Sequence, residues 1–153
     1  MRLLKDVLIE TGEIDKYFDG SAPVTLWRAK RKSQSGEIFE LVEKPLFKAG
    51  GIPRPADIKI EKRADGQEWV SVEFFPRGIS TFDKPKTFKG TGWEYYRIEA
   101  GIELPSGLAI VKDGYNRNYG AHHYTIAPAW DMPLAEFKAL LRYFVTFLIK
   151  EVA

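Results

Sequence analysis

The sequence predicts an α+β fold, with a compact body rich in strands and one helix near each end. Short apolar runs typical of strands fill the middle of the chain, and apolar residues at helical spacing occur at both ends. No linker, internal repeat or low-complexity tract divides the chain. Because 153 residues with 44% hydrophobic side chains suit one core of ordinary depth, we expect a single domain over residues 1–153.

The elements are predicted in order from this pattern. Leu3, Leu4, Val7 and Leu8 predict a short first helix, which a polar loop follows. Strands are expected over residues 24–29, 38–42, 58–60, 69–72, 93–98, 108–111 and 121–127. Residues 44–55 carry three prolines and two adjacent glycines, which exclude a helix or a central strand and predict a loop that crosses the surface or rims a cleft.

The last element is predicted to be an amphipathic helix. Its apolar residues recur at steps of three and four, namely Leu134, Phe137, Leu141, Phe144 and Leu148. Asp131 is placed to cap the first turn, and Pro133 is tolerated there because the first backbone donors of a helix have no partner within it.

Composition excludes several classes of protein. The net charge of +2 supplies no long-range field for nucleic acid or an anionic membrane, so we predict no membrane partner and find no strong sign of nucleic-acid binding. The absence of cysteine excludes disulfides and thiolate zinc sites, and it suits a reducing compartment. Charges interrupt the apolar start of the chain, which predicts no signal peptide. Adjacent His122 and His123 point to opposite faces of a strand, so no metal site is predicted.

Four short segments could carry chemistry: residues 26–29, 78–83, 115–116 and 122–128. None is a strong motif by spacing alone. From the residues alone, Arg28 suits the edge of a sheet, and the hydroxyls of Ser80 and Thr81 suit local backbone. Tyr115 and Asn116 equally suit an ordinary turn between two strands.

The order of these segments, taken with residues 53–58 and 113–132, resembles the cytotoxic type VI secretion effector family, whose fold is similar to that of ADP-ribosyltransferases. The resemblance runs from about Leu26 to the end of the last helix. Its most specific part is Lys112-Asp113-Gly114-Tyr115-Asn116, followed by His123-Tyr124-Thr125-Ile126, Pro128-Ala129 and Met132.

The resemblance implies a bacterial toxin that uses NAD, either as an ADP-ribosyltransferase or as an NAD glycohydrolase. It also implies that the protein is cytoplasmic when made and is delivered by a secretion machine into the cytoplasm of a target cell. A cognate immunity protein and a component of the secretion tube are the expected partners. The macromolecular target remains open.

The resemblance also assigns roles to residues. Arg28 would grip the phosphates and ribose of NAD, since a guanidinium matches phosphate oxygens in pairs. Ser80 and Thr81 resemble the Ser-Thr-Ser strand whose hydroxyls hold the nicotinamide ribose, although the third position here is Phe82. Tyr115 would stack on a ring of NAD, and Asn116 would bond an amide edge.

The sequence departs from the superfamily at the expected Glu-x-Glu, where it reads His122-His123-Tyr124. His123 is the preferred catalytic replacement because histidine exchanges protons near neutral pH, while Glu99 and Glu103 are alternatives more typical of turns. A plain core histidine is an equal alternative for His123.

We therefore expect Arg28, Ser80 and His123 to converge on one cleft, with Tyr115 or Asn116 at its rim. Two other functions stay open: a metal-independent ribonuclease that uses a histidine as acid and base, and a catalytically silent binding domain of the same fold.

Overall fold

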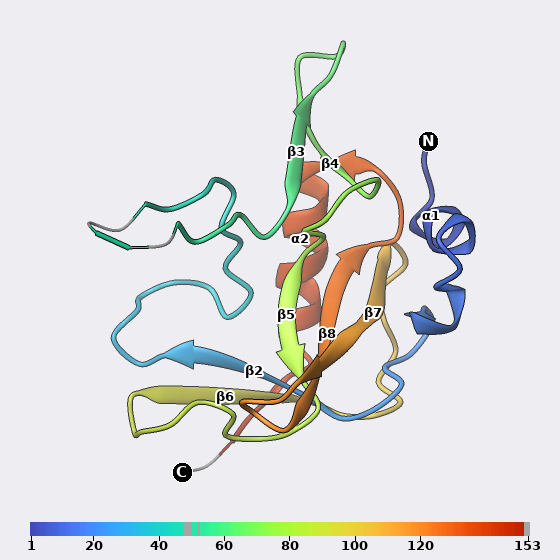
Figure 1. The fold of residues 1–153 in the computed structure, drawn as a ribbon. Coiled ribbons are helices and arrows are strands. Elements are labelled where there is room, and N and C mark those ends of the chain that lie inside the picture. Colours follow the sequence, from blue (N-terminus) through green and yellow to red (C-terminus); the bar gives the residue numbers. More distant parts are fainter. Residues whose placement is uncertain (48–49, 52, 152–153) are drawn as a thin grey trace.

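The computed structural model describes residues 1–47, 50–51 and 53–151, and it confirms the predicted α+β class (Figure 1). A seven-stranded antiparallel sheet forms the body. Its spatial order is β1 (Tyr17–Phe18), β7 (Leu108–Asn116), β8 (Ala121–Pro128), β5 (Ile79–Phe82), β2 (Leu26–Arg31), β6 (Trp93–Ile98) and β10 (Ile149–Lys150). A smaller sheet contains β3 (Lys59–Lys62), β4 (Glu68–Ser71) and β9 (Met132–Pro133).

Both predicted helices are present. Helix α1 (Leu4–Glu10) buries Leu4, Val7 and Leu8 in a cluster that includes residues of β7, and the short 3-10 helix η1 (Ile14–Lys16) follows it. Helix α2 (Leu134–Val145) lies behind β5 and β8 in Figure 1 and buries its predicted apolar stripe from Leu134 to Phe144. The helix ends at Val145, so Leu148 lies beyond it. No helix within the described residues is long and apolar enough to span a membrane.

The predicted cap of α2 is wrong. Pro133 occupies the N-cap position, without a side-chain hydrogen bond to the helix. Asp131 is buried, and its carboxylate instead accepts bonds from the Val72 N–H (2.9 Å) and from Arg63 Nη2 (2.8 Å). Asp131 therefore ties the start of α2 to the end of β4, because these polar groups must find partners once they are buried.

Most predicted strands are confirmed, and residues 93–98 match the observed bounds. The strand expected over residues 38–42 is absent: this segment is irregular, although Phe39 is buried and its ring lies 6.1 Å from that of Phe144. The apolar residues of this segment therefore pack in the core and do not form a β-ladder. The predicted loop over 44–55 has one isolated bridge, Leu46 to Arg54, while residues 48–49 and 52 fall outside the described part.

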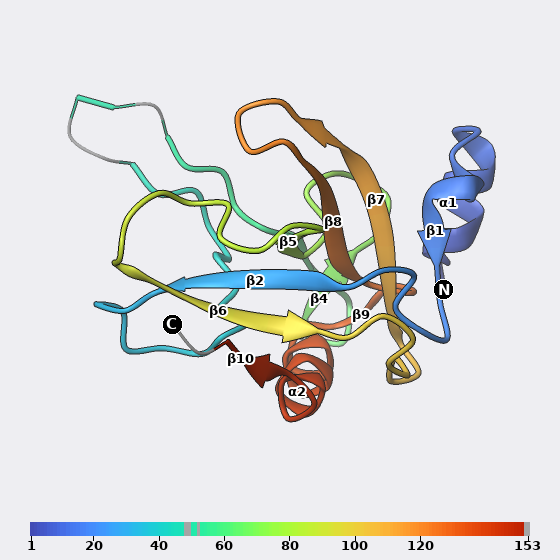
Figure 2. The same cartoon turned by 90° about the horizontal axis from the view of Figure 1, so that it is seen from below.

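The large sheet changes direction at β2, and this change positions the site. Strand β2 pairs with β6 over six residues but with β5 only at Trp27 and Phe82. Figures 1 and 2 both show β2 and β6 crossing the direction of β5, β8 and β7. Strand β5 therefore has β2 as a partner at Phe82 but not over its earlier residues, Ile79 to Thr81.

Candidate active site

A pocket of about 440 Å³ lies over the face of β5 and β8 that is opposite to α2. Its walls come from residues 54–57 and 75–78, from Ser80 on β5, Asp113 on β7, and His123 and Thr125 on β8. Two of the three predicted catalytic residues, Ser80 and His123, therefore share this pocket. A larger pocket of about 560 Å³ beside β6 contains none of the predicted site residues.

The register of β5 and β8 explains why Ser80 and His123 share one face. Ser80 pairs with Thr125 and Phe82 with His123, and paired residues of antiparallel strands point to the same side. The rings of Phe82 and His123 meet edge to face at 5.2 Å. Thr81 points the other way: it is fully buried, and its hydroxyl donates to the Tyr124 carbonyl at 2.8 Å.

Two carboxylate residues line the pocket, Asp57 and Asp113, and Asp113 is the one beside His123. The β7–β8 register shifts between Lys112 and Gly114, which leaves Asp113 as the extra residue of a bulge. Bulges re-aim side chains in this way and are common beside active sites. The Asp113 carboxylate lies between two residues of β8: its Oδ2 accepts bonds from the Thr125 hydroxyl and from His123 Nδ1, the latter at 3.0 Å.

The bond to Asp113 also fixes the orientation of the His123 ring. With Nδ1–H donating to the carboxylate, the neutral ring carries its lone pair on Nε2. His123 is then a proton acceptor at Nε2, held by a carboxylate behind it. The two glutamates that sequence reasoning offered lie elsewhere: Glu99 accepts a bond from Arg97 (2.8 Å), and neither Glu99 nor Glu103 lines the pocket.

Arg28 lies at the edge of β5 and not among the lining residues of the pocket. Its Nη1 donates to the Ser80 carbonyl and its Nε to the Ile38 carbonyl, both at 3.0 Å. The Ser80 carbonyl is available because β2 has left β5 by this point. Burial lowers the pKa of the Arg28 guanidinium, and nearby Asp57 opposes that shift. Of the three predicted residues, Arg28 contacts the backbone of Ser80, and Ser80 and His123 line the pocket.

Strand β7 continues through Tyr115 and Asn116, so they do not form the turn that was the alternative to a binding role. Neither residue lines the pocket, at whose rim we expected one of them. The bulge changes the parity of the strand, so that Gly114 faces His123 and Tyr115 faces His122. Tyr115 is exposed, with its ring 5.0 Å from that of His122. The Asn116 side chain accepts a bond from the Tyr119 N–H at 3.2 Å.

Sequence reasoning missed the charged wall of the pocket. Arg54 lies 3.5 Å from Asp57, whose other oxygen accepts the Val42 N–H at 2.7 Å. Arg77 is 6% exposed, and its guanidinium stacks 4.1 Å from the centre of the Phe75 ring. Residues 53–58 were part of the family resemblance, which was the available signal for Arg54 and Asp57. Arg77 gave none, since no pattern of neighbouring residues indicates that its side chain is buried.

Gly78 allows the pocket wall to approach β8. A Cβ at this position would lie 1.9 Å from the Ile126 carbonyl oxygen, which is closer than any real contact. Only glycine fits here, so the chain can pass from Arg77 into β5 directly against β8.

A strand-rich α+β fold is what we expected of the ADP-ribosyltransferase class, and two of the three residues expected in its site, Ser80 and His123, line one pocket. A family model described as Tse2 ADP-ribosyltransferase toxin matches residues 9–152, nearly the whole chain. The chain belongs to the Tse2 ADP-ribosyltransferase toxin family. No curated protein matches it.

This membership confirms the resemblance to an effector family with an ADP-ribosyltransferase-like fold. It also confirms the predicted enzyme class, a transferase that acts on NAD.

Proposed function

We propose that this toxin binds NAD in the pocket over β5 and β8 and breaks the bond between nicotinamide and ribose in the cytosol of a target cell. One observation carries the proposal within this family: the Asp113 carboxylate is hydrogen-bonded to His123 and Thr125 in the pocket that Ser80 also lines. A pocket of about 440 Å³ is within the usual size range of small-molecule sites, roughly 300–1,000 Å³.

The chemistry requires a group that stabilises positive charge on the ribose as the C–N bond breaks. Nicotinamide leaves with the bonding electron pair, and the ribose carbon becomes oxocarbenium-like. The Asp113 carboxylate supplies the negative charge that the missing glutamate supplies elsewhere in the superfamily, and the Ser80 hydroxyl holds the ribose.

The acceptor then adds through an oxygen or nitrogen atom, whose proton passes to His123 Nε2. Transfer to a macromolecule and hydrolysis follow this same route, with water as the acceptor in hydrolysis. Arg28, at the edge of β5, keeps the ribose part of its predicted NAD contact. Its bond to the Ser80 carbonyl adds a second role, because it fixes the backbone beside the ribose site.

The test is release of nicotinamide from NAD by the purified chain. We expect His123→Ala to lower the rate by about 10²-fold, the scale of one lost proton-transfer group. Ser80→Ala should lower it by about tenfold, the scale of one lost hydrogen bond to the ribose. Thr146→Ala is the matched hydroxyl control, since the Thr146 hydroxyl donates to the Tyr143 carbonyl at the end of α2 and does not line the pocket. Wild-type chain that binds NAD without releasing nicotinamide would indicate a silent binding domain, and cleavage of short RNA would indicate a ribonuclease.

We also propose that a cognate immunity protein covers the pocket and that a secretion machine, through its tube component, delivers the toxin. Leu46, Phe47, Phe74 and Phe75 are large apolar side chains that are 50% to 79% exposed. Phe75 lines the pocket, and Leu46 forms a β-bridge with Arg54, which also lines it. Exposed apolar groups of this kind mark protein interaction sites. Growth arrest on expression of the chain alone, relieved by the partner gene, is the expected result; harmless expression would contradict it.

A further inference from the structure

Arg77 is the buried cation of the pocket, and much of its hydrogen-bonding capacity is unused. Its Nε–H donates to the Val72 carbonyl at 3.1 Å, and its guanidinium stacks on the Phe75 ring. Among the residues that the structure describes, Nη1 is buried without a hydrogen-bond partner. Within the same residues, Arg77 forms no ion pair at 4.0 Å or less.

The other two arginines near the pocket are already engaged. Arg28 donates to two backbone carbonyls, and Arg54 is paired with Asp57 and bonds to the Pro55 carbonyl. Burying a guanidinium whose donors are unpaired is costly, so such a group is expected to have a function. Burial lowers the pKa of Arg77, and the Asp113 carboxylate across the pocket opposes that shift, so the two charges sense each other without forming a pair.

We infer that Arg77 forms an anion subsite of this pocket, and that its ligand is the diphosphate group of a dinucleotide. A guanidinium presents donors in a rigid fork that matches two phosphate oxygens, and a phosphate group would supply the acceptors that Arg77 lacks. The inference rests on the proposed function and deepens it. Ser80, Asp113 and His123 act at the ribose, and Arg77 determines where the diphosphate lies.

The test compares three ligands by isothermal titration calorimetry: ADP-ribose, inorganic pyrophosphate, and nicotinamide riboside, which has no phosphate. We expect Arg77→Met to weaken binding of the first two by about tenfold or more, the scale of one charged hydrogen bond. Binding of nicotinamide riboside should change by less than about twofold. Arg77→Lys keeps the charge but loses the fork, and it should give an intermediate loss.

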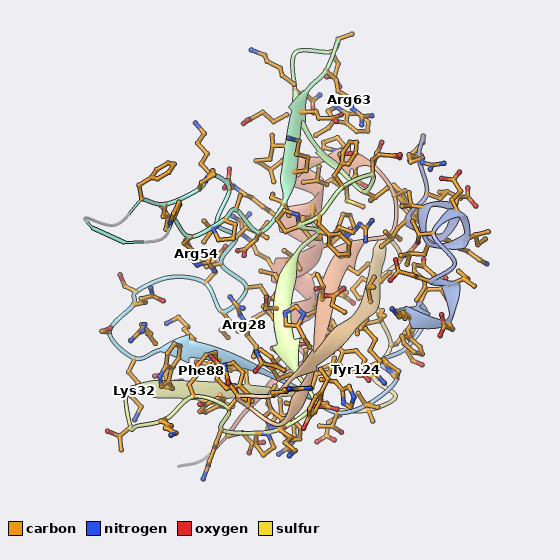
Figure 3. All side chains as sticks on the ribbon, viewed as in Figure 1. Arg28, Lys32, Arg54, Arg63, Phe88 and Tyr124 are labelled. Atoms are coloured by element: carbon orange, nitrogen blue, oxygen red, sulfur yellow. The ribbon has the colours of Figure 1, made fainter. Side chains whose placement is uncertain are left out.

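Arg63 offers a matched control. Its guanidinium also stacks on a ring, that of Trp69, at 4.7 Å, but it is ion-paired with Asp131. It lies just after β3, far from Arg28 and Arg54 (Figure 3). Arg63→Met should leave binding of all three ligands within about twofold of wild type. Circular dichroism reports whether each variant is folded.

A second measurement does not depend on the Arg77→Met variant. If Arg77→Met does not fold, the side-chain Nε–H resonance that disappears in Arg77→Lys identifies Arg77 in the wild-type NMR spectrum. This resonance should shift saturably as pyrophosphate is added, and no shift at saturation overturns the inference.

The outcomes separate this inference from the proposed function. A folded Arg77→Met variant that binds ADP-ribose as tightly as wild type overturns the subsite and leaves the NAD reaction standing. Wild-type chain that binds pyrophosphate through Arg77 but neither binds nor cleaves NAD supports the subsite and overturns the NAD reaction.

Discussion

His122 and His123 are adjacent on β8, yet their surroundings differ because a strand alternates its side chains. His123 lies in the pocket against Asp113, and His122 Nδ1 lies 2.9 Å from Asp83. We predict that His123→Ala lowers the rate of nicotinamide release by about 10²-fold with little change in the thermal midpoint. His122→Ala should do the reverse, lowering the midpoint more than the rate. Equal effects of the two variants on the rate would remove His123 from the chemistry.

Arg28 is predicted to affect both folding and activity. The family resemblance assigned Arg28 to NAD binding alone. Its bonds to Ser80 and Ile38 now lead us to expect a loss of about 2–4 kcal/mol in the free energy of unfolding, since two carbonyls lose a charged donor. Urea denaturation measures the loss, and killing should be compared at a temperature where the variant stays folded. An unchanged free energy of unfolding would contradict the structural role.

At the scale of elements, the contact of β5 with β8 depends on Gly78. We predict that Gly78→Ala lowers the free energy of unfolding by about 1–3 kcal/mol, because the new methyl group must displace the backbone at Ile126. Gly92→Ala is the control, since a Cβ there meets nothing within 4 Å. Urea denaturation of both variants checks this. Two equally stable variants would show that β5 can move away from β8 at little cost.

Helix α2 stabilises the opposite face of the sheet. Phe137 is completely buried in the core, while Tyr143 on the same helix is 57% exposed. Phe137→Ala should therefore cost about 3–5 kcal/mol of unfolding free energy through the cavity it leaves. Tyr143→Ala should cost less than about 1 kcal/mol, as expected of an exposed position. Thermal denaturation of the pair tests the assignment of the buried face, and a reversed order would contradict it.

These elements also show how far the sequence could be interpreted. The apolar stripe of α2 and the strand over 93–98 were predictable because their periodicity is local. Ser80 and His123 followed from a family resemblance combined with strand alternation. The bulge at Asp113, the N-cap at Pro133 and the irregular segment around Phe39 depend on contacts distant in sequence, which no local pattern encodes. Arg77 belongs to the same group, because the pocket beside it is built from residues 54–57, β7 and β8, which are distant in sequence.

At the scale of the whole molecule, one core joins the two sheets. Val70 and Ile58, at the small sheet, belong to the same buried cluster as Leu26 and Ile126 of the large sheet. We therefore expect a single cooperative unfolding transition, as the predicted single domain requires. Native-state hydrogen exchange tests this: the amides of Val70 and Ile126 should open with the same free energy. A markedly lower value at Val70 would show that the small sheet unfolds by itself.

The bulge on β7 gives the site a property that point mutations do not reveal. Removal of Gly114 would restore an even ladder, in which Tyr115 and Asn116 keep His122 and Ala121 as partners. Asp113 would then stand directly opposite His123, in the position that Gly114 occupies now. A deletion of one residue in this stretch therefore changes, in a single step, which residue of β7 stands opposite His123. Related chains can differ in what they accept through the length of this strand as well as through its residues.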